Sequence, residues 1–202
     1  MKVCVIGGGQ AGFQVCESLV GKGFKGKLIL IGEEPFPPYQ RPPLSKNYLS
    51  GKLERDRLFL RPKEYYADNG IELIYGQRVD EINLNRKQVF TSNNNVITFD
   101  KLVLATGADL KKIENLKESL NIHYLRSLEE SSFLREKISK DKKIIIIGGG
   151  FIGLEIAAVC VQRGLEVCVI EQTDRLMKRA VPNDVSDFYK NYHTARGVNI
   201  FT

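Results

Sequence analysis

The chain has 202 residues, of which 43% are hydrophobic, and a formal net charge of +6 from 30 basic and 24 acidic side chains. This length allows one large domain or two small ones with ample buried core. The charge is mild, and no basic stripe interleaved with aromatic residues occurs, so nucleic-acid binding is not expected. The apolar runs are too short to span a bilayer, and a first strand starting at Lys2 leaves no room for a signal or transit peptide. We therefore expect a globular, cytoplasmic protein without membrane contact.

The first expected elements are a strand from Lys2, a glycine-rich turn and a helix to about Lys22, followed by a strand at about 27–32. Prolines recur between Glu34 and Lys46, which excludes a helix interior or a central strand there and predicts an irregular loop that covers a ligand. The pattern then predicts a helix at 62–69, strands at 71–75, 79–83, 88–91 and 96–99, and a buried strand at 102–107 that ends in a glycine turn.

The charged segment 109–119 is the candidate linker between two units. It divides the chain into a first nucleotide-binding domain over 1–112 and a second over 113–202. The second is expected to contain a helix at 128–139, a strand at 144–147 that is apolar on both faces like a central parallel strand, helices at 153–163 and 183–196, and a strand from 198. A doubly wound domain needs further strands, so the second unit is expected to be truncated. The predicted fold class is α/β, with two Rossmann-like, three-layer nucleotide-binding units.

One glycine-rich motif occurs twice, each time after a short apolar strand, at Gly7, Gly9 and Gly12 and again at Gly148, Gly150 and Gly153. The first glycine allows a tight turn, the second lets backbone N–H groups approach a pyrophosphate, and the third packs helix against strand. Glu33 and Glu171 each end an apolar stretch about 20 residues later, where a carboxylate accepts hydrogen bonds from a ribose. Two dinucleotide sites are predicted; the alternative is a pair of structural turns with incidental acids.

The four cysteines, Cys4, Cys16, Cys160 and Cys168, fall in expected strands and helices without any C-x-x-C or C-x-x-x-x-C pair. A dithiol that shuttles electrons needs two nearby sulfurs, so a reductase of the glutathione or lipoamide kind is not expected. We expect inert, buried thiols instead. The two histidines, His123 and His193, lack metal-ligand spacing, and no metal site is expected.

Three segments carry a resemblance to a known family: 38–46 (PYQRPPLSK), 105–108 (ATGA) and 148–155 (GGGFIGLE). With them the chain resembles the N-terminal half of the FAD-dependent ferredoxin reductases of the putidaredoxin reductase and biphenyl dioxygenase reductase type, in the pyridine nucleotide-disulfide oxidoreductase superfamily. The RPPLSK string is the most specific part and is shared mainly with apoptosis-inducing factor. The chain departs from the family at 109–112 (DLKK), where an arginine and prolines usually follow.

The resemblance implies one FAD site and one NAD site. The implied FAD-binding residues are Gly7, Gly9, Ala11 and Gly12 at the pyrophosphate, Glu33 rather than Glu34 at the ribose, Val79 on the adenine side, Arg41, Pro43, Lys46 and Arg126 at the flavin, and Ala105, Thr106 and Gly107. The implied NAD-binding residues are Gly148, Gly150, Ile152 and Gly153 in the turn, Glu155 near the nicotinamide and Glu171 at the ribose.

Two of these side chains would act on the chemistry. A cation such as Lys46 near flavin N5 or N1 would stabilise the anionic reduced ring, and Glu155 would lie beside the nicotinamide. The alternative for Lys46 is an exposed lysine after a turn, and for Glu155 an acid that merely suits the first turn of a helix. The alternative for Arg126 is an ordinary surface arginine. Arg175 is close enough in sequence to Glu171 to soften its repulsion of the NADPH 2′-phosphate.

The resemblance implies that NADH passes a hydride to FAD and that single electrons then go to a ferredoxin-type iron–sulfur protein in an oxygenase system. One alternative is a redox-responsive binding flavoprotein like apoptosis-inducing factor. Another is an inactive fragment, because family members run to roughly twice this length and complete the flavin domain in their second half. The 202 residues alone are then expected to bind FAD weakly and to expose apolar faces that favour homo-oligomers.

Overall fold

The computed structural model describes residues 1–114, 119, 121–139 and 142–202. The chain forms two compact units, one of residues 1–40 and 56–112 and the other of residues 41–55 and 113–202. The proline-rich segment 41–55 thus groups with the second unit, whereas the sequence interpretation placed it in the first. Of the expected linker, residues 115–118 lie outside the described residues.

The first unit is built on a parallel sheet with the strand order β3-β2-β1-β7. Its strands and helices, in chain order, are β1 (Lys2–Ile6), α1 (Gln10–Gly21), β2 (Lys27–Gly32), α2 (Lys63–Asp68), β3 (Ile71–Tyr75), β4 (Val79–Asn83), β5 (Gln88–Thr91), β6 (Val96–Thr98) and β7 (Lys101–Leu104). The crossovers through α1 and α2 both step the same way across the sheet, so right-handed connections place both helices on one face.

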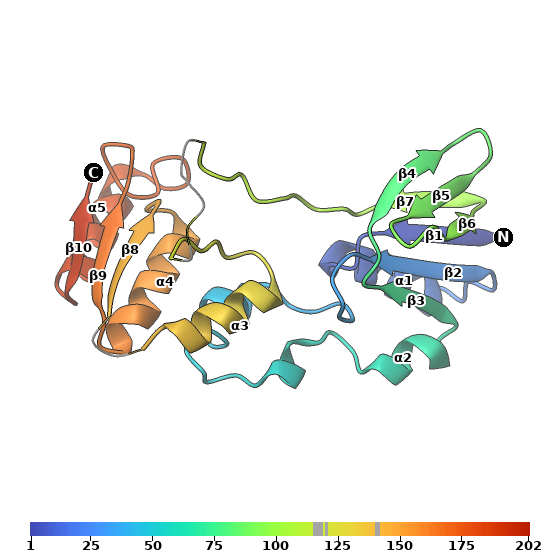
Figure 1. Cartoon of the computed structure of the whole chain (residues 1–202), viewed down its shortest axis with the longest axis horizontal. Helices are drawn as coiled ribbons and strands as arrows, with labels where there is room; N and C mark the ends of the chain where they lie inside the picture. The colour runs from blue at the N-terminus through green and yellow to red at the C-terminus, as the bar shows by residue number, and fades with distance from the viewer. Residues whose placement is uncertain (115–118, 120, 140–141) are drawn as a thin grey trace. The chain divides into compact units, whose positions relative to one another are not determined.

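Alternation along the strands creates two cores in this unit (Figure 1). One face of the sheet packs against α1 and α2; its buried residues are Val3, Val5, Leu28 and Leu30 with Phe13, Cys16 and Tyr66. The other face packs against the antiparallel sheet β4-β5-β6; its buried residues are Cys4, Ile6, Ile29 and Ile31 with Val89 and Phe99. The three expected layers are therefore present here.

The second unit has a parallel sheet in the order β10-β9-β8. Its strands and helices are α3 (Leu128–Lys137), β8 (Lys143–Ile147), α4 (Phe151–Gln162), β9 (Glu166–Ile170), α5 (Asn183–Thr194) and β10 (Val198–Phe201). A capping box starts α3, because Ser127 Oγ accepts from the Glu130 amide while the Glu130 carboxylate accepts from the Ser127 amide. The core beneath the sheet includes Ile146, Val167, Val169 and Val198 with Leu154 and Ala157 of α4.

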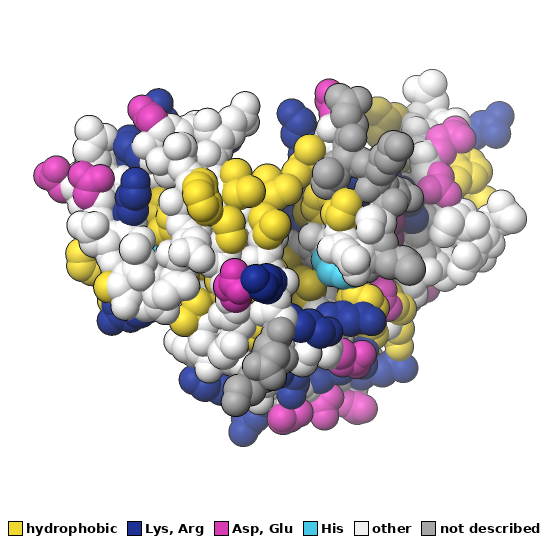
Figure 2. Space-filling model, turned by 60° about the vertical axis from the view of Figure 1, so that its left-hand side comes forward, with side chains coloured by type: hydrophobic (Ala, Val, Ile, Leu, Met, Phe, Trp, Pro, Cys, Tyr) yellow, Lys and Arg dark blue, Asp and Glu magenta, His cyan; other side chains and the backbone are white. Residues whose placement is uncertain are grey.

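The surroundings of β8 differ from the expected central strand. Within the described part of the chain β8 pairs only with β9, and Ile145 and Ile147 are 66% and 60% exposed. In the first unit the sheet β4-β5-β6 covers the equivalent face, and no described segment covers it here. Hydrophobic side chains are indeed gathered on the face of the molecule seen in Figure 2. The apolar composition of β8 suits a strand that is buried on both faces. Among the described residues, α4 covers one face, and no layer covers the other.

His193 on α5 gives the second unit a pH-dependent stability. The side chain is buried, and burial together with nearby Arg196 lowers its pKa below the ordinary value. The unfolded chain then binds a proton more readily than the folded one, so the contribution of neutral His193 is complete above about pH 6.5 and is lost as the pH falls below it. We expect the urea midpoint to fall between pH 7.5 and 5.5, and to fall less in His193→Gln.

The exposed His123 provides the matched control, His123→Gln, which should keep the pH dependence of the unmodified protein. An equal fall in His193→Gln and in the unmodified protein would assign the effect to other groups.

Candidate nucleotide-binding sites

Backbone conformation explains two of the six motif glycines, and the close approach of the helix to the turn explains two more. Gly7 and Gly148 have φ angles of 121° and 108°, a region that L side chains rarely adopt. A Cβ atom on Gly12 would lie 1.9 Å from the Gly7 carbonyl oxygen, and one on Gly153 would lie 2.1 Å from that of Gly148. These four positions need glycine for the fold itself.

The middle glycines have no such structural reason. Gly9 has φ −89° and ψ −170°, and Gly150 has φ −83° and ψ −177°, which are extended conformations that any residue adopts. A Cβ atom at either position would meet no protein atom within 4 Å. Each precedes a twelve-residue helix, α1 or α4, so each leaves open space at a helix N-terminus. Such a cradle fits a diphosphate, which the N–H groups and the helix dipole attract.

The end of β7 lies against the first turn. The Ala105 amide donates to the Ile6 carbonyl at 2.7 Å, and a Cβ atom on Gly7 would lie 2.0 Å from the Ala105 carbonyl oxygen. Thr106 and Gly107 follow, both exposed, and so is Ala11 in the first turn of α1. The structure thus brings together the turn and the segment 105–107 that the sequence analysis grouped with it.

Glu33 and Glu34 differ in their partners. The Tyr39 hydroxyl donates to the Glu34 carboxylate. Glu33 is 61% exposed and accepts from Arg78 Nη1 at 3.1 Å. Glu33 is thus the more exposed of the two carboxylates at the end of β2, and its choice over Glu34 as the ribose acceptor stays a prediction.

Arg78 is a neighbour that the sequence analysis missed. Its hydrogen bond to Glu33 raises its pKa, with Asp109 and Asp80 adding to the effect. The residue directly precedes Val79 at the start of β4, and a basic residue beside the expected adenine contact was the signal available. It comes next to Glu33 only through the fold.

Glu171 lies at the end of β9 and is held by three hydrogen bonds. One carboxylate oxygen accepts from the Gly149 amide at 2.8 Å, and the other accepts from the Thr173 amide at 2.9 Å and its hydroxyl at 2.8 Å. Burial alone would raise its pKa, but the bonds from Thr173 and Gly149 outweigh it, so the pKa lies below its ordinary value. Glu171 is therefore an oriented, charged acceptor tied to the second glycine turn.

The two candidate catalytic side chains form one cluster within the second unit. Lys46 Nζ lies 2.8 Å from a Glu155 carboxylate oxygen, which also accepts from the Ser45 hydroxyl at 2.5 Å. Lys46 follows the 3₁₀ turn Pro42–Ser45, and Glu155 is on α4. Their side chains are 48% and 28% exposed, so water and a ligand can reach them.

The rest of the segment 41–55 is anchored to α3 and α4. Arg41 donates to the Arg126 carbonyl at 2.7 Å, the buried Ser131 donates to the Leu44 carbonyl at 2.7 Å, and the Tyr48 and Ser132 hydroxyls are 2.7 Å apart. Arg41 and Arg126, predicted as flavin neighbours, are thereby brought together. Sequence reasoning missed Ser131 and Ser132, because serine within a helix gives no signal of a distant partner.

The remaining predicted residues are placed as follows. Pro43 is half-buried in the 3₁₀ turn, and Val79 is half-buried against the β4-β5-β6 core. Ile152 in the first turn of α4 is 55% exposed. Contacts of these three with a nucleotide stay predictions.

The thiols match their expected environment. All four cysteines are free, three of them buried, and burial raises the pKa of Cys4, Cys16 and Cys160 to about 11, 12 and 11. Such thiols stay protonated and unreactive near neutral pH.

Over the described ranges, no cluster of three or more His, Cys, Asp or Glu side chains could hold a metal ion. None of the helices in those ranges is long and apolar enough to cross a membrane.

Comparison with known proteins agrees with this arrangement. Residues 1–202 match the profile of the pyridine nucleotide-disulphide oxidoreductases. The chain is 40% identical over 201 residues to rhodocoxin reductase of Rhodococcus erythropolis, covering 99% of this chain and 47% of that protein. It is 36% identical over 204 residues to putidaredoxin reductase CamA of Pseudomonas putida, covering 99% and 48%.

A chain in the crystal structure of the covalent putidaredoxin reductase–putidaredoxin complex superposes with a TM-score of 0.97 at 36% identity, covering 100% of this chain and 49% of that one. The present chain thus spans about half the length of the curated relatives it matches.

Proposed function

Because the chain belongs to the pyridine nucleotide-disulphide oxidoreductase family, we propose that it forms the nucleotide-binding part of an NADH-dependent flavoprotein reductase. FAD binds at the first glycine turn and NAD at the second. Electrons pass from NADH through FAD to a ferredoxin-type iron–sulfur protein that serves an oxygenase system in the cytoplasm. The names of the relatives, reductases of rhodocoxin and putidaredoxin, support this choice of partner.

The observation that carries the proposal is the open space at Gly9 and Gly150. Both backbones are unstrained, and a Cβ atom there would meet no protein atom within 4 Å. The glycine therefore serves something outside the protein, and a pyrophosphate that must approach backbone N–H groups closely fits that requirement.

Bound FAD would supply the conversion of a two-electron hydride transfer into one-electron steps. The contribution of this chain lies in Ser45, Lys46 and Glu155. The Ser45 hydroxyl and the Lys46 ammonium both bind one Glu155 oxygen, which fixes the direction of the carboxylate. The Lys46 ammonium would supply a positive potential for negative charge that develops on a nearby ring.

Glu171 gives the second site its preference for NADH. A carboxylate has about four acceptor positions, and three are occupied by Gly149 and Thr173, which leaves room for a ribose hydroxyl. A 2′-phosphate about 4 Å from this charge is repelled by up to about 4 kcal/mol at an effective dielectric constant near 20.

The first prediction concerns FAD. In Gly9→Val a branched side chain fills the space meant for the pyrophosphate, so bound flavin measured by absorbance should be lost, while the fold loses at most about 1 kcal/mol for a poorer N-cap. Gly12→Val is the matched comparison: its side chain collides with the Gly7 carbonyl, so thermal stability and flavin are both lost. Stoichiometric FAD in Gly9→Val would refute the assignment of the first turn.

The second prediction concerns NADH. The unmodified protein should have a kcat/KM for NADH at least about tenfold above that for NADPH. This ratio corresponds to only part of the Coulomb repulsion energy, because salt screens the rest. Glu171→Gln keeps the shape and removes the charge, so the ratio should approach one. Equal kcat/KM values in the unmodified protein would contradict the role of Glu171.

The third prediction is that no cysteine carries electrons, because no two cysteines stand at the spacing of a redox motif and the three buried thiols, Cys4, Cys16 and Cys160, stay protonated. A variant with all four cysteines changed to alanine or serine should reduce its iron–sulfur acceptor at an unchanged rate per bound flavin. The rate of flavin reduction by NADH, followed separately, is the control. Loss of acceptor reduction with flavin reduction intact would reveal a thiol relay.

A further inference from the structure

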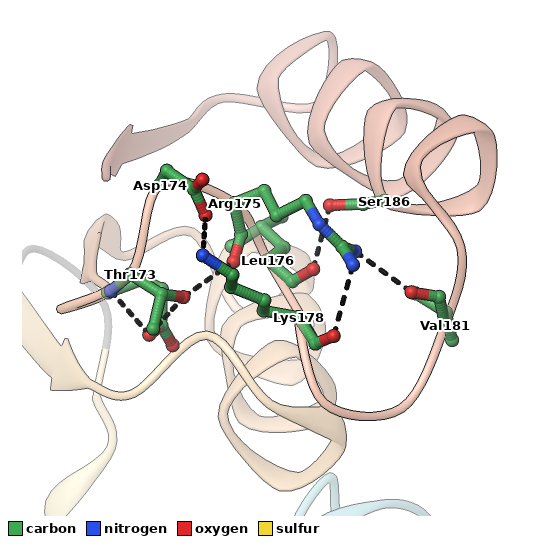
Figure 3. Close-up of polar contacts among 8 residues, drawn as sticks. Thr173, Asp174, Arg175, Leu176, Lys178, Val181 and Ser186 are labelled. Atoms are coloured by element: carbon green, nitrogen blue, oxygen red, sulfur yellow. Dashed lines mark hydrogen bonds and ion pairs between the residues drawn. The ribbon is translucent and has the colours of Figure 1, made fainter.

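The loop between β9 and α5 is closed by the side chain of Arg175 (Figure 3). Arg175 Nη1 donates to the Val181 carbonyl at 2.9 Å, and Nη2 donates to the Lys178 carbonyl at 3.0 Å. Both acceptors belong to the loop itself, so the guanidinium ties its second half into one closed turn. Breaking these bonds would leave two carbonyl groups without their charged donor, at a cost typical of charge-assisted hydrogen bonds.

The same loop is fastened to the glycine turn and to α5. The Met177 amide donates to the Gly149 carbonyl at 3.0 Å. The Ser186 hydroxyl donates to the Leu176 carbonyl at 2.7 Å, and both residues are fully buried. The peptide groups beside Arg175 therefore have fixed positions relative to Gly149.

Thr173 connects the loop to Glu171. Its hydroxyl lies 2.8 Å from a Glu171 carboxylate oxygen and 2.9 Å from the Arg175 carbonyl oxygen, within donating distance of both. The other Glu171 oxygen accepts from the Gly149 amide. The Thr173 hydroxyl has one proton and donates to one of these two acceptors at a time, while the Thr173 amide donates to Glu171 in either case. Thr173 thus lies between the Arg175 backbone and Glu171, which is bonded to the glycine turn.

We propose that Arg175 is a positioning residue for the NAD site, which holds the loop that orients Glu171 and Gly149, rather than a cation that binds the 2′-phosphate of NADPH. The proposal rests on the proposed function of the second glycine turn. The guanidinium directs Nη1 and Nη2 at two loop carbonyls, so these donors are engaged within the loop, while the positive charge of Arg175 remains (Figure 3).

The test compares Arg175→Met with Lys178→Met in the full protein. Lys178 is on the same loop, and its exposed side chain forms an ion pair with Asp174. Its backbone carbonyl, which accepts from Arg175, survives the substitution. Direct titration gives the Kd of NADH and of NADPH, and hydrogen exchange gives the protection of the Gly149 and Thr173 amides without any nucleotide. Arg175→Lys tests partial rescue, and Thr173→Val removes the link to Glu171 while leaving Arg175 in place.

For a positioning role, Arg175→Met raises the Kd of NADH by about tenfold, equivalent to one charge-assisted hydrogen bond, and changes that of NADPH less. The Gly149 and Thr173 amides exchange faster, Thr173→Val shifts the NADH to NADPH ratio in the same direction, Arg175→Lys lies in between, and Lys178→Met matches the unmodified protein. If Arg175→Met selectively weakens NADPH, the guanidinium binds the phosphate and the proposal fails. Unchanged exchange and unchanged Kd values also overturn it.

The proposed function can fail separately. An unmodified protein that binds neither nucleotide contradicts the assignment of the second turn. In that case, faster exchange of the Gly149 and Thr173 amides in Arg175→Met still shows that Arg175 holds the loop.

Discussion

Both units depend on the close approach of a helix to the strand that precedes it. Gly12 and Gly153 have no Cβ, so the carbonyl oxygens of Gly7 and Gly148 lie where that atom would be. Packing density in protein interiors leaves no room for even one methylene at such a contact. The approach holds the N-terminal turns of α1 and α4 against their sheets and so directs free N–H groups at the open space beside Gly9 and Gly150. A ligand site and a folding requirement are thus parts of one turn, carried by different glycines.

The irregular segment 41–55 is held in place by hydrogen bonds to the rest of the second unit. Its prolines exclude regular structure, and its hydrogen bonds go to residues far away in the sequence, from Leu44 to Ser131 and from Ser45 to Glu155. These partners give Lys46 a defined direction on a loop that would otherwise be an exposed coil. An irregular segment can carry a precise charge when a rigid scaffold supplies its hydrogen bonds.

Local patterns predicted most of the elements, because their causes are local. The strands at 2–6 and 27–32 follow from short apolar runs, and α3 follows from the capping box at Ser127. The resemblance implied Lys46 at the flavin and Glu155 near the nicotinamide, but it did not predict the ion pair, which joins positions that no spacing relates. Arg78 comes beside Glu33 only through the fold, and the bonds from Thr173 to Glu171 depend on the conformation of the loop after β9. Ile145 and Ile147 are exposed, although an apolar strand was expected to be buried on both faces. An apolar composition shows only that a strand suits burial, and the segments packed around it decide whether it is buried.

The two acidic residues of the repeated motif show how far the copies have diverged. Glu33 is opposed by an exposed cation, Arg78, at 3.1 Å, so its charge is compensated through an ion pair that salt screens. Glu171 is opposed by no such cation within hydrogen-bond distance among the described residues; the fixed amides of Gly149 and Thr173 hold it instead. Backbone donors orient a carboxylate without neutralising it. Glu33 therefore lies beside a positive charge at hydrogen-bond distance, whereas Glu171 is held by backbone and hydroxyl donors, with the charge of Arg179 also lowering its pKa.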